Sequence, residues 1–332
     1  MKKILYFGNL YHAEASLAME LNAGSDYKFI PVFTHSFNDV FDNDFKPYFN
    51  FKKLFNPYVI IPDPVEMAKI IDKEKPNIII DRCWVDFANY PPPGTIFWKI
   101  ESSARSLEDD PLPMILPVSG HAAFLTFNHV EVPEYKKVLG IPVSFLPYSV
   151  STHWDKPLAK TMDVMVTGTC ANIEKIQSYE LLTKKVCETL PKGSVNIYAH
   201  CGANNLNWVK DNLRPLYYAE QSPILMAQAK IFISPVTTRF DPGTISHKTL
   251  QAMGCRTLVL TQHYKGVEDM LGPDGQFVIY ADSQEEALKK VIYYLKHDYE
   301  RDAIAQRAYT FAHGEYNGTK VFKRALKDIG IE

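Results

Sequence analysis

The stretch that decides the fold is DPGTISHKTLQAMGCRTLVLT, residues 241–261. It joins a Pro-Gly turn, a short amphipathic segment, a break of small residues and a β-branched run. Ser246 is predicted to cap a helix that begins at about His247, and Gly243 lets backbone N–H groups approach a ligand closely. Such a helix start suits a phosphate, because its N–H groups lack helical partners and carry partial positive charge. The plainer interpretation is only a turn, a helix and a strand of an α/β sheet.

Strand-like runs and helical periods alternate on both sides of this stretch. The strand-like runs are KILYF (3–7), FIPVF (29–33), YVIIP (58–62), NIIID (77–81), TIFWKI (95–100), MILPVS (114–119), VSFLPYS (143–149), DVMVTG (163–168), SVNIYAH (194–200), KIFISP (230–235), RTLVLT (256–261) and QFVIYA (276–281). Their continuous apolar character is typical of parallel sheets that are buried on both faces. We therefore predict an α/β protein with two tandem Rossmann-like domains that face a central cleft.

The domain boundary is predicted at about 150–160. There the segment THWDKPLAKT (152–161) interrupts the strand pattern with a proline and polar residues. The division gives domains of 1–152 and 153–332, and we expect the last helix, at about 317–328, to pack back on the first domain.

Composition excludes several classes of protein. The 332 residues are 46% hydrophobic and 22% charged with a net charge of −2, which favours a globular protein without a general attraction to nucleic acid or anionic membranes. The five cysteines form no CxxC pair and are predicted to be reduced thiols. The amino-terminal apolar run ends at Gly8 and Asn9, and no run approaches the ~18 to 20 apolar residues of a membrane span. We expect a cytoplasmic protein.

Residues that follow the strands are the first candidates for a site, because ligands of open α/β sheets bind beyond the carboxyl ends of the strands. In the first domain these candidates are Gly8, Glu101 and His121. In the second domain they are Gly168, Thr169, Cys201, Gly202, Arg239, Gly243, Thr244, Ile245, Ser246, His247 and Lys248.

The second half also resembles a known family. The ordered segments ILMAQAKIFISPV (224–236), HKTLQAMGCRTLVLT (247–261), GVEDML (266–271) and FVIYADSQEEALKKVIYYLKHDYERDAIAQRAYTFA (277–312) resemble the carboxyl-terminal domain of GT-B glycosyltransferases. They are most similar to the branch related to spore-maturation glycosyltransferases. FWKIE (97–101), YKKVLGIPVSFLPYSVS (135–151) and DVMVTGTCANIEKIQSYELLTKKV (163–186) stand in the order expected for that branch, so the resemblance covers about 95–325.

The resemblance implies transfer of a sugar, with retention, from a nucleotide sugar held by the second domain to an acceptor held by the first. The phosphates would lie at 243–248. Gln251 matches a position at which related proteins often carry a ribose-binding glutamate, and Gly243 matches the earlier acid of that pair. Lys175 lies where a basic residue often meets the diphosphate, whereas on residue type alone it is a solvated helix lysine. Arg239 and Lys248 flank the phosphate position.

Two residues of the first domain are candidate catalytic groups. The carboxylate of Glu101 could orient an acceptor hydroxyl or stabilise positive charge at the anomeric carbon, and its structural alternative is an ion pair with Arg105. His121 could donate a hydrogen bond to the sugar or the acceptor, and its alternative is a buried core histidine.

We expect neither a metal nor another cofactor. The DxD-like Asp42-Asn43-Asp44 lies in a polar, aromatic segment and not at a strand end, and Glu108-Asp109-Asp110 precedes a proline in a predicted turn. FGNLYHAEA after the first strand lacks a GxGxxG pattern, which disfavours a dinucleotide.

Three functions remain open from the residues. The first is a metal-independent glycosyltransferase, the second a sugar-nucleotide epimerase on the same frame, and the third a non-catalytic nucleotide- or sugar-binding module. The acceptor could be a glycan, a lipid-linked sugar, a small metabolite, a protein side chain or a modified DNA base, because the first domain carries no acceptor motif.

Overall fold

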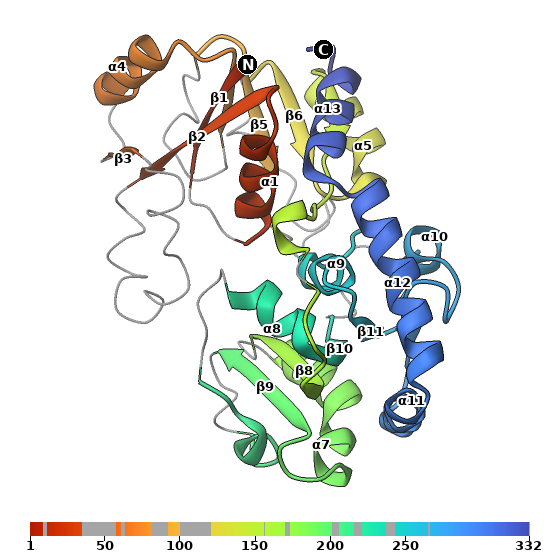
Figure 1. Ribbon diagram of the computed structural model, residues 1–332. Helices are drawn as coiled ribbons and strands as arrows, with labels where there is room; N and C mark the ends of the chain where they lie inside the picture. The colour runs from red at the N-terminus through yellow and green to blue at the C-terminus, as the bar shows by residue number, and fades with distance from the viewer. Residues whose placement is uncertain are drawn as a thin grey trace. The chain divides into compact units, whose positions relative to one another are not determined.

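The structure is a computed structural model. It describes residues 1–8, 12–34, 58–60, 64–81, 92–99, 121–155, 157–169, 173–200, 206–215, 221–236, 243–264 and 266–331. The chain divides into two compact units, Met1–Ser149 with Asn317–Glu332 and Val150–Tyr316. Both are parallel-sheet α/β units, as the sequence predicts (Figure 1).

The first unit contains a parallel sheet with the strand order β3-β2-β1-β4-β5-β6-β7. Its strands are β1 (Lys2–Phe7), β2 (Tyr27–Thr34), β3 (Tyr58–Ile60), β4 (Ile78–Asp81), β5 (Thr95–Lys99), β6 (Ala123–Thr126) and β7 (Val143–Phe145). Its helices are α1 (His12–Ala23), α4 (Pro64–Glu74), η5 (His129–Glu131), α5 (Val132–Leu139) and α13 (Gly318–Asp328). The runs that form β1 and β4 are buried on both faces, which explains their continuous apolar sequence.

The second unit contains a parallel sheet with the strand order β12-β11-β10-β8-β9. Its strands are β8 (Met162–Thr169), β9 (Val195–His200), β10 (Ala229–Ser234), β11 (Leu258–Thr261) and β12 (Ile279–Tyr280). Its helical segments are η6 (Thr152–Trp154), α6 (Ile173–Tyr179), η7 (Glu180–Lys184), α7 (Lys185–Thr189), η9 (Lys210–Asn212), α8 (Ser222–Gln228), α9 (His247–Gly254), α10 (Val267–Leu271), α11 (Gln284–Lys296) and α12 (Asp298–Glu315). Its core is formed by side chains of β8, β9, β10 and β11 packed with η7, α7 and α11.

The last helix, α13, packs within the first unit although it follows the second in the chain. It contacts α1 and β7, and Figure 1 shows α1 and α13 side by side. Asn317 caps it by accepting a hydrogen bond from Lys320 N at 3.2 Å. Phe322 is fully buried and meets Tyr27 edge-on, with 5.4 Å between ring centroids. Its apolar stripe thus completes the core of the first unit.

Two strands are clearly shorter than the sequence predicts, and the first is β7, which contains only Val143–Phe145 of the run 143–149. The run 276–281 reads as a strand, but β12 contains only Ile279–Tyr280. Residues 272–278 are used by turns, in which Gly272 and Gly275 have φ of 71° and 82° and Gly275 N donates to Val278 O at 2.8 Å. An apolar run therefore overestimates a strand when its first residues are needed to close a turn.

Candidate functional site

The topology of each sheet marks one crevice at which a ligand is expected. In the second unit the chain passes from β8 to β9 on one side and then to β10 on the other, so the strand order reverses between β8 and β10. In the first unit the reversal falls between β1 and β4. Ligands of open parallel sheets bind beyond the carboxyl ends of the strands at such switch points. Site residues should therefore follow β8 and β10 in one unit, and β1 and β4 in the other.

The segment before α9 combines a glycine of positive φ with the start of a helix. α9 begins at His247, as predicted. Gly243 is buried and has φ of 114°, a conformation that L side chains rarely adopt, so a valine there would strain the backbone as well as obstruct a ligand. Thr244 and Ile245 are buried, whereas His247 and Lys248 are half-buried. The amino end of α9 carries the positive end of the helix dipole and favours an anion.

Ser246 stands at the capping position, but the prediction that its side chain caps α9 is wrong. The hydroxyl makes no capping hydrogen bond, and only its backbone carbonyl takes part, accepting from Leu250 N at 3.2 Å. Serine is favoured at this position because its hydroxyl can accept a hydrogen bond from an N–H group in the first turn of the helix. In this protein the Ser246 hydroxyl takes another orientation. A capping hydroxyl would compete with an anion for the same N–H groups, so this orientation is compatible with ligand binding.

The loop after β11 braces the segment before α9. The hydroxyl of Tyr264 donates a hydrogen bond to the carbonyl of Thr244 at 2.8 Å. Burial raises the pKa of the Tyr264 hydroxyl, so it stays a donor at ordinary pH. The backbone that would carry a phosphate is therefore held from the neighbouring strand end.

Hydroxyl and amide groups join α9 to the ends of β10 and β11. Ser234 and Thr249 share a hydrogen bond of 2.9 Å between their hydroxyls, and Thr261 donates to the carbonyl of Ser234 at 3.1 Å. Gln251 is 2% exposed, and its Oε1 accepts from Ser222 Oγ at 3.1 Å. Its Nε2 has no hydrogen-bond partner among the residues that the structure describes. A ligand hydroxyl could supply that partner.

Gly168 and Thr169 end β8 at the switch point, as the sequence predicts. A Cβ on Gly168 would lie 2.3 Å from the hydroxyl oxygen of Tyr179 in α6, so packing within the unit already requires a glycine there. Lys175 lies on α6, and its side chain lies outside the described residues. Of this group, Gly168 has a structural role that the sequence did not indicate.

Several predicted site residues lie outside the described part of the chain. They are Glu101 with its alternative partner Arg105, Cys201, Gly202 and Arg239. Asp42, Asp44 and the acidic run at 108–110, for which no metal-binding role is expected, also lie outside it. Their roles stay predictions.

In the first unit, the switch point is flanked by Gly8 after β1 and Asp81 at the end of β4. Gly8 N donates to Val32 O at 3.1 Å, which continues the ladder between β1 and β2. Asp81 is buried, and burial raises the pKa of its carboxyl above the ordinary value, with a nearby histidine opposing the rise. Sequence reasoning missed Asp81. The available signal was an acidic residue that ends the otherwise apolar run NIIID.

His121 is the partner of Asp81. We expected it to follow a strand over 114–119, and that strand lies outside the described residues, so this part of the prediction stays untested. His121 precedes β6, and its imidazole packs edge-on against Phe97 with 5.2 Å between ring centroids. Its Nε2 lies 3.3 Å from Asp81 Oδ2, because the ring reaches past β5 toward the end of β4. This geometry is that of the buried histidine considered as the structural alternative.

The Asp81→Asn variant is expected to become more stable relative to the parent as the pH rises. The raised pKa means that the folded state favours protonated Asp81, so the parent loses stability as the pH climbs from about 4, the value of an unfolded aspartate, through the folded pKa. Asparagine does not titrate, so its stability relative to the parent should be greater at pH 8 than at pH 4. Urea denaturation at pH 4, 6 and 8 measures it. A stability difference that is the same at all three pH values would contradict the burial of an ionised carboxylate.

The carboxyl end of α9 is anchored by the first residues of the second unit. Arg256 forms an ion pair with Asp155, and its guanidinium lies 3.7 Å from the ring centroid of Tyr309 on α12. The Tyr309 hydroxyl also donates to Asp155 at 2.6 Å. His313 on α12 lies 3.1 Å from the carbonyl of Gly254 through its Nε2. The linker and α12 thus fix the end of α9 that is remote from the candidate phosphate position.

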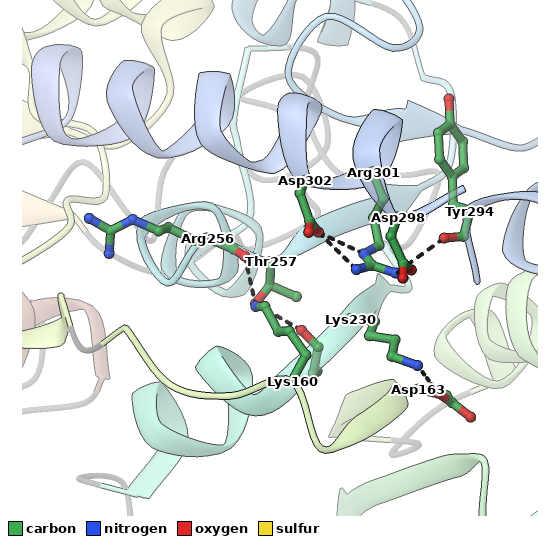
Figure 2. A network of polar contacts seen from close by, with 10 residues as sticks. Lys160, Asp163, Lys230, Arg256, Thr257, Tyr294, Asp298, Arg301 and Asp302 are labelled. Carbon is green, nitrogen blue, oxygen red and sulfur yellow. Dashed lines mark hydrogen bonds and ion pairs between the residues drawn. The ribbon is translucent and has the colours of Figure 1, made fainter. Parts of the chain in front are cut away.

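A second group of contacts, centred on Lys160, extends this anchor (Figure 2). Lys160 Nζ donates to the carbonyl of Arg256 at 2.7 Å and to Thr257 Oγ1 at 3.0 Å. Burial lowers the pKa of Lys160 to about 8. In the same view Arg301 is paired with Asp298 and Asp302. Lys160 therefore joins the linker to the turn after α9, whereas Arg301 pairs with carboxylates of its own helix.

The residues that the structure describes contain no group of three or more His, Cys, Asp or Glu side chains that could hold a metal ion. Across the same residues, no helix has both the length and the apolar character to cross a bilayer.

Residues 177–327 match the family described as glycosyl transferase-like. A search of curated proteins finds no significant match. The branch related to spore-maturation glycosyltransferases stays a prediction.

Solved structures match the chain over nearly all of its length. HepE from Anabaena, in complex with UDP and glucose, has a TM-score of 0.66 at 12% identity, over 98% of this chain and 99% of its own. Sucrose-phosphate synthase from Thermosynechococcus elongatus has a TM-score of 0.65 at 10% identity, over 98% and 97%. A putative UDP-N-acetylglucosamine 2-epimerase from Listeria monocytogenes has a TM-score of 0.56 at 11% identity, over 100% and 98%. The chain has the fold of the GT-B glycosyltransferases.

Proposed function

We infer that this chain, whose residues 177–327 match the glycosyl transferase-like family, is a glycosyltransferase that uses a nucleotide-sugar donor. The observation that carries the inference is this match, because it includes α9 and the strand ends around it. We further propose a uridine diphosphate sugar as donor, since HepE has been crystallised with UDP and with UDP-glucose. The cytoplasmic location expected from the sequence stays a prediction.

We propose that the second unit holds the donor. The diphosphate would bind the backbone N–H groups at the start of α9, at Gly243–His247, where the helix dipole favours negative charge. Lys248, Arg239 and Lys175 would add positive charge around it. Gln251 would use its unpartnered Nε2 to donate a hydrogen bond to a ribose hydroxyl. Gly168, Thr169, Cys201 and Gly202 complete the proposed donor side.

We propose that the first unit holds the acceptor near the ends of β1 and β4. Gly8 allows close approach of backbone, and Glu101 is the first candidate to orient the acceptor hydroxyl or stabilise charge at the anomeric carbon. His121 is the second candidate, with Asp81 orienting its imidazole. Stabilisation of the leaving diphosphate would come from the α9 dipole and the basic side chains, without a metal ion. Retention of configuration is carried over from the family resemblance.

The proposal is tested by incubating the protein with a panel of nucleotide sugars. Turnover is followed by released nucleotide, and binding by calorimetric titration. Release of nucleotide supports a transferase, formation of an epimer supports the alternative suggested by the Listeria protein, and binding without change supports a non-catalytic module. Failure to bind any nucleotide sugar would overturn the proposal. Candidate acceptors are then tested by class, from glycans to modified DNA bases.

Two further measurements use the same panel. EDTA is expected to leave donor binding and turnover unchanged, and a strict need for magnesium or manganese would return attention to Asp42 and Asp44. Gln251→Met keeps the side-chain volume and should weaken donor binding about fivefold, on the order of 1 kcal/mol for one neutral hydrogen bond. Gln306→Met, on the exposed face of α12, is the matched control and should bind like the parent.

A further inference from the structure

Gln262 carries a buried side-chain amide that none of the contacts around α9 involves. It is the first residue after β11, so it stands at the carboxyl end of the strand next to β10. Its side chain belongs to a residue that is 4% exposed. Its Oε1 has no hydrogen-bond partner within the described part of the chain. A buried acceptor without a partner destabilises the folded state, and native proteins rarely keep one without a reason.

The loop that carries Gln262 is fixed beside the start of α9. Tyr264, two residues further on, donates to the carbonyl of Thr244 at 2.8 Å. On its other side, His263 N donates to Asp282 Oδ1 at 3.3 Å. Thr261, directly before Gln262, donates to the carbonyl of Ser234 at the end of β10. These bonds place Gln262 in a segment that cannot move independently of the proposed phosphate position.

The chemistry of the unpartnered atoms restricts what could meet them. Gln262 offers an acceptor oxygen, and Gln251 in α9 offers donor hydrogens on Nε2. A phosphate presents acceptors only, so it cannot satisfy Gln262. A hydroxyl both donates and accepts, and can satisfy either amide. Two neutral amides with complementary needs therefore fit the hydroxyl-bearing part of a donor, while the start of α9 fits its charged part.

We propose that Gln262 is a donor-specificity residue, whose amide oxygen accepts a hydrogen bond from an O–H or N–H group of the bound nucleotide sugar. This inference rests on the proposed function and adds a residue of the β11–α10 loop to its donor site. The group that meets Gln262 belongs either to the nucleoside or to the transferred sugar. Both present the same chemistry, and the experiment distinguishes them.

The test uses Gln262→Met in the full chain, because methionine keeps the volume and removes both polar atoms. Without ligand, the melting temperature of the variant should equal or exceed that of the parent, since the unsatisfied buried amide oxygen is gone. Its dissociation constant for the best nucleotide sugar of the panel should rise about tenfold, because the site no longer accepts the bond. The opposite directions of the two changes separate a ligand contact from a structural role.

The parent and each variant are titrated with UDP and with UDP-glucose. They are also titrated with the nucleotide sugar of the panel that binds most tightly and with the nucleoside diphosphate that it contains. If the variant binds both the nucleoside diphosphate and the nucleotide sugar more weakly, the contact is with the nucleoside. If it binds only the nucleotide sugar more weakly, the contact is with the sugar. Gln306→Met is the exposed control, and Gln262→Leu serves if the methionine variant misfolds. Unchanged binding by a folded variant overturns this inference alone. A parent that binds no nucleotide sugar overturns the proposed function as well.

Discussion

Phe322→Ala is expected to lower the free energy of unfolding by about 3–5 kcal/mol, the range for removing a buried aromatic ring from a core. Phe322 is fully buried in α13 and lies edge-on to Tyr27 at 5.4 Å, so alanine leaves a cavity between α13 and the first unit. Urea denaturation followed by intrinsic fluorescence measures the change.

Arg324→Ala is the matched control for Phe322→Ala. It lies on the exposed face of the same helix, so its effect should stay within about 0.5 kcal/mol. Equal effects of the two substitutions would mean that α13 does not complete the core of the first unit.

Gly168→Ala should destabilise the second unit by about 1–3 kcal/mol through overpacking. The added Cβ would stand 2.3 Å from the Tyr179 hydroxyl oxygen and 3.2 Å from the ring, and Tyr179 is part of the buried core. The displaced ring would also disturb the end of β8, so donor binding should weaken with stability. Thermal unfolding and calorimetric titration measure the two effects.

A second substitution identifies the cause. Tyr179→Phe removes the oxygen that the new methyl group meets, so the double variant should recover about 1 kcal/mol or more of the loss. Gly314→Ala is the control, because a Cβ there meets nothing within 4 Å and alanine favours the helix. If the two substitutions simply add, the contact between Gly168 and Tyr179 does not explain the need for glycine.

The sequence predicted the sheets well because local burial leaves a direct trace in it. Apolar runs such as NIIID and KIFISP became β4 and β10, and the helix start at His247 followed from its turn and capping pattern. Prediction failed where a contact depends on residues far apart in the chain. The residues next to Gly168 in the sequence give no indication of its contact with Tyr179. Those next to His121 give no indication of its contact with Asp81, because only the folded sheet brings β4 and the start of β6 together.

Side-chain orientation was the other limit. The position of Ser246 follows from a backbone preference, but which way its hydroxyl turns depends on the folded surroundings. The same holds for Gln251 and Gln262, whose type suggests exposed polar residues and whose unpartnered atoms become visible only in the structure. For the proposed donor site, the sequence therefore indicated the segment, and the unpartnered atoms of Gln251 and Gln262 could be found only from the structure.

The anchoring of α9 at its carboxyl end bears on the thermodynamics of donor binding. Arg256, Asp155 and Tyr309 hold that end, while Tyr264 holds the backbone before the opposite end. A helix fixed in this way loses little conformational entropy when a ligand binds, because its order is already present in the free protein. Affinity for a ligand at its amino end would then be determined by the contacts made and not by the ordering of the site, so the proposed donor would meet a preorganised surface.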